Sequence, residues 1–114
     1  MKIGIVGPEG YKNPDILSII GKVVTKVMKA HNLTEEHIQL QVIGADNVSS
    51  SVLDFITDRS FQYYSTGRWL RKDALPTMAG RIDYALIFSP SSEECLEMFV
   101  EECKKFKVKR KVIL

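Results

Sequence analysis

The order of apolar and polar positions along the chain predicts an alternation of short strands and helices. Apolar runs of strand length lie at residues 2–6, 38–43, 61–64, 84–88 and 111–114. Between several of them, apolar residues recur at intervals of three and four, which is typical of helices with one buried face. We expect helices over about 14–30, 48–58 and 93–106, and a short or broken helix over 70–79, because Pro76 lies inside that segment.

Strands that alternate with helices predict one parallel β-sheet with right-handed crossovers. Residues 84–88 form the most continuous apolar run, which is typical of a central strand covered on both faces. Residues 61–64 are short and aromatic, which favours a place near the sheet edge. We therefore predict the α/β class: a single-domain, Rossmann-like, three-layer α/β/α sandwich whose five parallel strands have the order 3-2-1-4-5.

Residues that favour helix ends support these boundaries. Asn13 is expected to cap the first helix, with Pro14 as its first residue, and Asn32 is expected to end it in a left-handed conformation. Ser92 is expected to cap the last helix, with acidic residues following in its first turn. The inward positions of that helix are expected to end with Cys103 and Phe106.

Composition and charge bear on which classes of partner the protein has and where it is located. The 114 residues carry a net charge of +2, which is too small to predict a polyanionic partner. Six of the eight residues in 104–111 are basic, but we interpret this run as a solvated helix end, so we expect no nucleic-acid partner. No apolar run of about 18 residues occurs, and Met1 leads straight into a strand, so we expect neither a membrane partner nor a signal peptide, and a cytoplasmic location.

The cysteines and histidines do not form a metal-binding pattern. Cys95 and Cys103 are eight residues apart in one expected helix, so we predict free, buried thiols in a reducing compartment. His31 and His37 are expected at the opposite end of the sheet from the candidate site, with no third ligand. We expect neither a metal nor a cofactor.

Three turns that follow strands carry glycine or small hydroxyl residues. The carboxyl ends of parallel strands meet at one edge of the sheet, where ligands bind, and helix starts there attract phosphate. Neither a G-x-G-x-x-G loop nor a P-loop is present, so a dinucleotide-binding Rossmann domain and a P-loop NTPase are both disfavoured. The ligand-binding residues expected in these turns are Gly7, Pro8, Glu9, Gly10 and Tyr11, then Gly44, Ala45 and Asp46, and then Ser89, Ser91 and Ser92.

Over nearly its whole length the chain resembles the SLOG superfamily of small Rossmann-like domains. This superfamily includes the Lonely Guy type phosphoribohydrolases (lysine decarboxylase-like), the YspA-like proteins and the DNA-processing protein A domain. The family has a glycine turn after each of its first two strands, and the turns at 7–11 and 44–46 stand in these places. The family also has a basic pair on a helix, where this chain has Arg71-Lys72, and an A-D segment, where it has Ile82-Asp83. Residues 90–98 stand where the family has P-G-G-x-G-T-x-x-E, but they lack its glycines and its threonine.

The resemblance implies a site that binds a nucleotide or a nucleotide-like phosphate, with Arg71 and Lys72 as additional ligand-binding residues. In the phosphoribohydrolases an arginine and the motif's glutamate are the catalytic pair. Here Arg71 and Glu97 are the corresponding candidates, although Met98 occupies the glutamate position itself and Glu97 lies one residue earlier.

Our functional hypothesis is therefore a nucleotide-binding module of SLOG type. Two alternatives stay open: a hydrolase or transferase acting on N-glycosidic bonds, and a non-catalytic interaction protein that forms homo-oligomers. The relatives imply a homodimer or a higher homo-oligomer. Two residues have competing roles: Tyr11 either stacks on a base or packs in the core, and Asp46 either contacts a ribose or caps the second helix.

Overall fold

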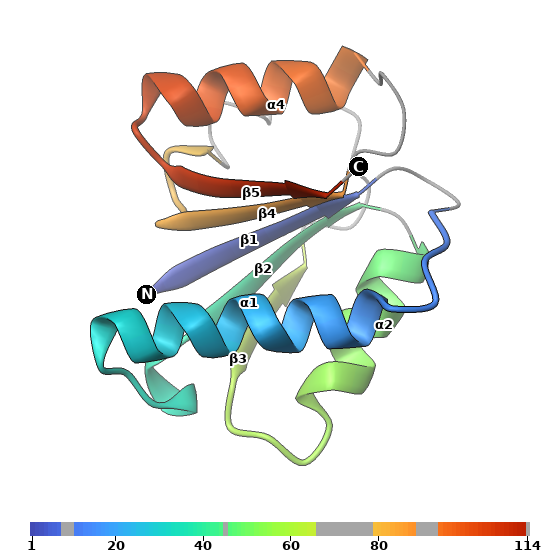
Figure 1. Cartoon of the computed structure of the whole chain (residues 1–114), viewed down its shortest axis with the longest axis vertical. Coiled ribbons are helices and arrows are strands. Elements are labelled where there is room, and N and C mark those ends of the chain that lie inside the picture. The colour runs from blue at the N-terminus through green and yellow to red at the C-terminus, as the bar shows by residue number, and fades with distance from the viewer. Residues whose placement is uncertain (8–10, 45, 66–78, 89–93, 114) are drawn as a thin grey trace.

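The computed structural model describes residues 1–7, 11–44, 46–65, 79–88 and 94–113. Five parallel strands form one sheet in the order β3-β2-β1-β4-β5, as predicted (Figure 1). The described elements are β1 (Lys2–Gly7), α1 (Ile16–His31), a 3-10 turn (Glu35–His37), β2 (Gln39–Gly44), α2 (Asp46–Ile56), β3 (Gln62–Ser65), β4 (Tyr84–Phe88), α4 (Glu94–Lys105) and β5 (Lys109–Ile113).

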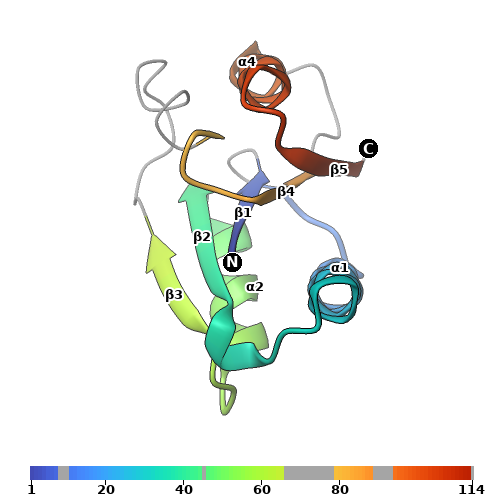
Figure 2. The ribbon, with the colours of Figure 1, turned by 90° about the vertical axis from the view of Figure 1, so that its left-hand side faces the viewer.

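The described helices cover the two faces of the sheet in a way that follows from strand order. From β1 to β3 the chain moves toward one edge, and from β4 to β5 it moves toward the other. Because crossovers between parallel strands are right-handed, these two directions place their helices on opposite faces. Accordingly, α1 and α2 cover one face and α4 covers the other (Figures 1 and 2). The molecule is an α/β/α sandwich, as the sequence predicts.

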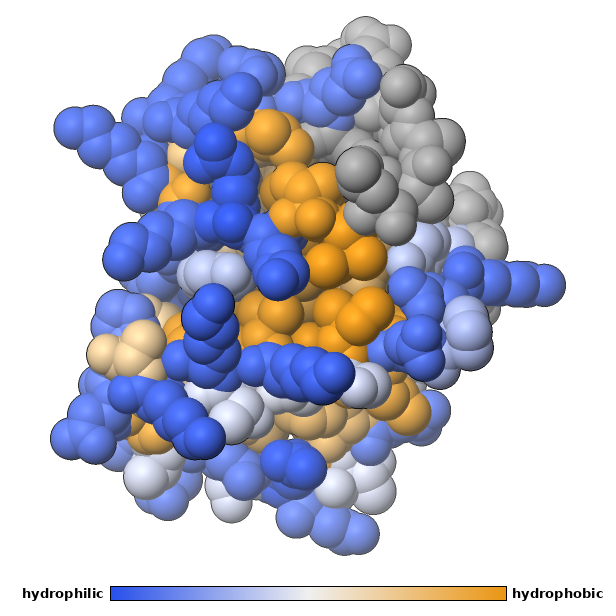
Figure 3. All heavy atoms as spheres, in the orientation of Figure 1, coloured by the Kyte–Doolittle hydropathy of each residue, from blue (hydrophilic) through white to orange (hydrophobic). Residues whose placement is uncertain are grey.

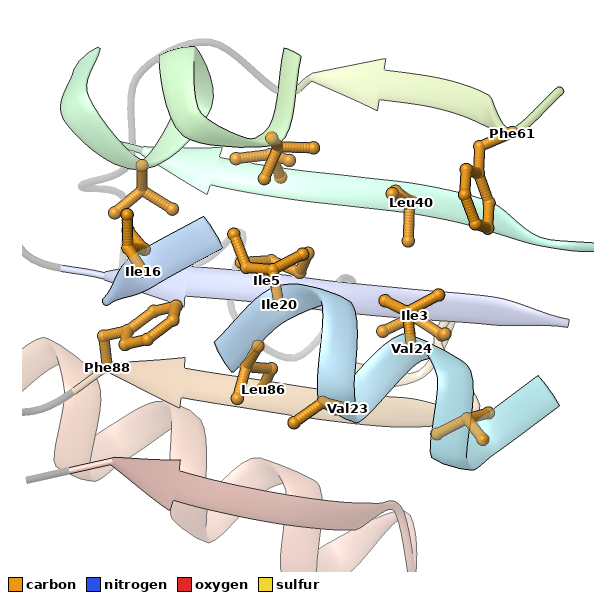
Figure 4. Packing of buried hydrophobic residues seen from close by; sticks show 14 of the residues in the cluster. Ile3, Ile5, Ile16, Ile20, Val23, Val24, Leu40, Phe61, Leu86 and Phe88 are labelled. Carbon is orange, nitrogen blue, oxygen red and sulfur yellow. The ribbon is translucent and has the colours of Figure 1, made fainter. Parts of the chain in front are cut away.

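The sheet separates two apolar clusters, and β4 contributes to both. Leu86 and Phe88 pack with Ile3, Ile20 and Val24 on the α1 side (Figure 4). Ala85 and Ile87, the residues that alternate with them, pack on the α4 side. All four of these β4 side chains are fully buried. The prediction that residues 84–88 form a central strand covered on both faces is therefore confirmed.

The C-terminal end of α1 follows the predicted capping residue, but its start does not, because Asp15 rather than Asn13 occupies the N-cap position and makes no side-chain capping hydrogen bond. The Asn13 Oδ1 accepts the backbone N–H of Asp15 at 2.9 Å, and α1 begins at Ile16, so Pro14 lies in the turn before the helix. At the other end Asn32 has φ 54° and ψ 48°, the predicted left-handed conformation. The next residue, Leu33, donates its N–H to the carbonyl of Met28 at 2.9 Å, which closes the last turn.

Several boundaries differ by one or two residues from those that the sequence predicts, and the start of α2 and the start of β5 are two of them. α2 begins at Asp46 rather than at residue 48. β5 begins at Lys109 rather than at residue 111, because α4 ends at Lys105 and Lys107 turns the chain with a left-handed φ of 57°. The basic run therefore lies largely in a turn and a strand rather than at a helix end.

Phe106, which the sequence predicts to face inward, is instead exposed, and Leu17 of α1 is exposed as well. Phe106 is 51% exposed, because α4 ends one residue before it and Val108, at 6%, takes the buried position after the turn. Leu17 is 46% exposed, because it lies at the margin of the apolar stripe of α1, whose buried positions include Ile16 and Ile20.

Asp83 joins the starts of β1 and β4 at the amino edge of the sheet. Its carboxylate accepts the backbone N–H of Lys2 at 2.8 Å, and its own N–H donates to the Lys2 carbonyl at 2.7 Å. These bonds align the two central strands. Asp83 thus has a structural role at the end of the sheet opposite the candidate site.

Cys103 is a free, fully buried thiol on the inner face of α4, as predicted. Burial disfavours the thiolate and raises the pKa of Cys103 from its ordinary value of 9.0 to about 11, and the nearby positive charge of Arg110 opposes this only in part. The side chain of Cys95 lies outside the described residues.

We expect Cys103 to make the stability of the protein depend on pH in the alkaline range. Because the folded state holds the neutral thiol, its contribution is fully present below the unfolded pKa of 9.0 and is lost as the pH rises toward the folded value of about 11. Urea unfolding of wild type and Cys103→Ala, in reductant at about pH 8 and about pH 10.5, measures this contribution. The stability advantage of wild type should shrink at the higher pH, and an unchanged difference would contradict the assignment.

Candidate functional site

After β1 the chain adds β2 and β3 toward one edge of the sheet, and then adds β4 and β5 on the other side of β1. In open parallel sheets, ligands bind at the carboxyl ends of the two strands between which this reversal occurs, here β1 and β4. β1 ends at Gly7 and β4 ends at Phe88. β2 ends beside β1, with Gly7 and Gly44 in register. The last residues of β1 and β2 therefore lie side by side, as the sequence predicts for these strand ends.

Tyr11, which follows β1 in the chain, packs against Phe88 at the end of β4. Its ring lies 5.1 Å from that of Phe88, centroid to centroid, and the residue is 7% exposed. The Tyr11 hydroxyl oxygen accepts a hydrogen bond from the Asn13 Nδ2 at 2.9 Å. Of the two roles that the sequence allows for this ring, the structure shows core packing. Asn13 thus orients the phenol and also closes the turn that precedes α1, where its Oδ1 accepts the N–H of Asp15.

Gly7 is required by the packing of α2 against β1. A Cβ atom at this position would lie 2.7 Å from the Cγ2 of Val48 and 3.5 Å from the Cβ of Phe88. Since Val48 is fully buried, the first turn of α2 lies directly against the β1 backbone. This close approach brings the α2 start to the edge where the Tyr11 segment also lies.

A groove of about 540 Å³ lies between the segment that leads into α1 and the first half of α2. Its volume is in the range of small-molecule sites, but the groove is shallow and largely open to solvent. The groove contains one cationic group, the ammonium group of Lys12. It also contains hydrogen-bonding groups, which are the amide of Asn13 and the hydroxyls of two serines. Such groups suit an anionic, hydroxylated ligand. The residues that line it are Tyr11, Lys12, Asn13, Pro14, Ile16, Ser50 and Ser51.

The structure brings together only part of the site expected from the sequence. Gly7, Tyr11, Gly44 and the first residue of α2, Asp46, lie at or beside one edge of the sheet. Glu97 is exposed on α4, which covers the opposite face of the sheet from the groove. The predicted residues that lie outside the described part of the chain are Pro8, Glu9, Gly10, Ala45, Arg71, Lys72, Ser89, Ser91 and Ser92.

Sequence reasoning does not identify Lys12 as a candidate ligand-binding residue, and it assigns Asn13 only to the helix cap. The signal is present, because a lysine next to an Asn-Pro helix start places a cation close to that start. Ser50 and Ser51 belong to a serine run whose composition is typical of helix starts and anion sites, but a serine run does not show which neighbour it faces.

Comparison of the chain with protein-family models, with curated proteins and with solved structures finds no match. Among the described helices, none is long and apolar enough to cross a membrane. Within the same part of the chain, no three histidine, cysteine, aspartate or glutamate side chains come together as a metal site. Functional inference therefore rests on the geometry of the sheet edge.

Proposed function

We propose that the protein is a nucleotide-binding module of SLOG type, which binds a nucleotide or a nucleotide-derived ligand at the carboxyl edge of its sheet. The observation that carries this proposal is the groove beside the switch point between β1 and β4, where Tyr11, Lys12 and Asn13 face Ser50 and Ser51. Its size, its cation and its hydroxyl groups fit a phosphorylated sugar better than an apolar ligand.

Side chains rather than the first amides of α1 hold the phosphate in this proposal. The backbone N–H of Asp15 already donates to the Asn13 Oδ1 at 2.9 Å, and that of Ile16 donates to the Asn13 carbonyl at 3.1 Å. Lys12 is exposed and forms no ion pair with any described residue, and in this proposal its ammonium group binds the anion. The serine hydroxyls of α2 accept or donate to a ribose or a phosphate from the other wall.

Binding without turnover is the form of this function that the described residues favour. None of the described residues that line the groove is an aspartate or a glutamate, and a hydrolase acting on an N-glycosidic bond needs a carboxylate within reach of the ribose. The candidate glutamate, Glu97, lies in the helical layer on the other face of the sheet. We therefore place hydrolysis second to binding.

Isothermal titration with AMP, ADP, ribose 5-phosphate and inorganic phosphate tests the proposal. We expect a nucleoside phosphate to bind, and Lys12→Glu to weaken it by about tenfold or more, because the variant replaces an attraction with a repulsion. Lys29→Glu, an equal charge change at an exposed position of α1, is the matched control and should bind as wild type does. Sedimentation velocity of the same samples tests the expected homodimer.

Two results would contradict the proposal. One is the absence of thermal stabilisation by any of these compounds at about millimolar concentration in a folded sample, since a ligand that binds the native state must raise its stability. The other is equal weakening by Lys12→Glu and Lys29→Glu, which would indicate a general effect of net charge. Release of free adenine from AMP would favour the hydrolase instead.

A further inference from the structure

β5 is an edge strand with an unusual concentration of positive charge. It pairs only with β4, so its outer backbone N–H and C=O groups have no partner strand among the described residues. Four of its five residues are exposed: Lys109, Arg110, Lys111 and Val112. Cationic side chains and free main-chain groups therefore lie along the same edge.

The cations of β5 project from both faces of the sheet. Lys111 is in register with Leu86, so it and Lys109 lie on the α1 side, whereas Arg110 is in register with Ala85 on the α4 side. Neither lysine forms an ion pair with a described residue. The two lysines that end α4 differ, because each contacts a glutamate of its own helix at 3.1 Å. The charge of β5 is thus not neutralised within the described part of the chain.

Edge protection and nucleic-acid binding each account less well for this charge. Lysines can protect an edge strand from unwanted pairing, but the opposite edge, β3, has the uncharged sequence Gln-Tyr-Tyr-Ser. A nucleic acid presents its phosphates to one face of a protein, whereas Lys109 and Arg110 point to opposite faces of this edge. An extended peptide that joins the edge has side chains on both faces in the same way.

Apolar surface lies next to this edge. Figure 3 shows apolar side chains gathered at the surface between β5 and α1. Ile113 and Ile19, from these two elements, are only partly buried and pack against the α1-side cluster. Val112 is 39% exposed on the α4 side. A partner strand that lies along β5 would therefore contact, on each face of the sheet, first a cationic side chain and then an apolar one.

We propose that the outer edge of β5 binds an extended acidic segment of a partner protein by strand addition. The carboxylates of the segment pair with Lys109 and Lys111 on one face and with Arg110 on the other, and its apolar residues contact Ile113 and Val112. Main-chain hydrogen bonds supply affinity, and charge selects the partner. A second copy of this chain does not fit, because two antiparallel β5 strands place like charges opposite each other.

The test uses a fluorescent peptide with the core sequence Glu-Glu-Glu-Val-Val, which presents carboxylates and then an apolar side chain on each face of an added strand, as Lys109–Ile113 requires. A second peptide of the same sequence is N-methylated at alternate residues. Fluorescence anisotropy should show binding of the first peptide only, because N-methylation removes the main-chain donors. Lys109→Gln/Lys111→Gln should weaken binding by about tenfold, while Lys22→Gln/Lys29→Gln, two exposed lysines of α1, should leave it unchanged. Amide chemical shifts of the wild-type protein should change in β5, which requires no variant.

Several outcomes would overturn the proposal. Equal binding of the N-methylated peptide would show that charge alone drives association. Tighter binding of a single-stranded oligonucleotide, lost in the same β5 variant, would assign the edge to nucleic acid. Shift changes confined to another element, or no binding of the first peptide, would remove β5 as the site. None of these results depends on nucleotide binding at the carboxyl edge.

Discussion

Replacing Phe88 with alanine is expected to lower the free energy of unfolding by about 3–5 kcal/mol, the usual effect of removing a buried aromatic side chain. Phe88 is fully buried at the end of β4 and contacts the ring of Tyr11. Its ring lies on the α1 side, near Ile16 (Figure 4). The variant loses the transfer free energy of the ring and leaves a cavity that the stiff strands around it fill only partly.

Urea unfolding followed by circular dichroism measures this loss. Phe106→Ala removes the same atoms from a side chain that is 51% exposed, so it is the matched control and should change stability by no more than about 0.5 kcal/mol. A loss under about 1.5 kcal/mol in Phe88→Ala would show that the site collapses around the missing ring. Since Phe88 holds Tyr11, the variant should also weaken nucleotide binding if the proposed site is correct.

Gly7→Ala is expected to destabilise the protein by about 1–3 kcal/mol, the usual cost of overpacking a filled core. The added Cβ would lie 2.7 Å from the Cγ2 of Val48. Val48 is fully buried and β-branched, and such a side chain in a helix has one strongly preferred χ1 rotamer, so rotating it away from the contact is costly. We therefore expect the backbone of α2 to shift away from β1.

Gly4→Ala is the comparison for this effect. Its Cβ would also lie 2.7 Å from a side-chain atom, but that atom is the terminal Cδ1 of Ile82, which rotation about χ2 can move, while the Cγ2 of Ile82 would lie at 3.2 Å. We expect Gly4→Ala to cost less than Gly7→Ala in the same denaturation experiment. Equal costs would show that α2 tolerates displacement, and the groove between α1 and α2 would then be adaptable rather than fixed.

The fold follows from features that are local in sequence. The alternation of strands and helices, the continuous apolar run of β4 and the right-handed crossover rule together lead to the observed strand order. The left-handed conformation of Asn32 is predictable because few residues other than glycine and asparagine adopt it at low cost. The end of α4 is not predictable in this way, because Lys107 takes the same conformation without any signal in its side chain.

The candidate site depends on distances between elements, which sequence patterns do not contain. The groove exists because Gly7 lets Val48 approach β1 and because the Tyr11 ring packs against Phe88, and both contacts join residues far apart in the chain. Sequence reasoning predicts that the ends of β1, β2 and β4 share one edge of the sheet, and the structure has them there. It misses Lys12 because a lone exposed lysine has the same appearance in a site as on any solvated surface.

The central position of β1 has a consequence for the order of folding. β1 pairs with β2, from which it is separated by one helix, and also with β4, which begins at Tyr84. The first pairing closes a short loop, whereas the second must wait for much more of the chain and has a larger entropic cost. During synthesis, β1, α1 and β2 can assemble first. The face of β1 that bears Val6 is then not yet covered, because α4 lies later in the chain. Arrival of β4, aligned by the Asp83–Lys2 hydrogen bonds, then commits the nascent chain to its final topology.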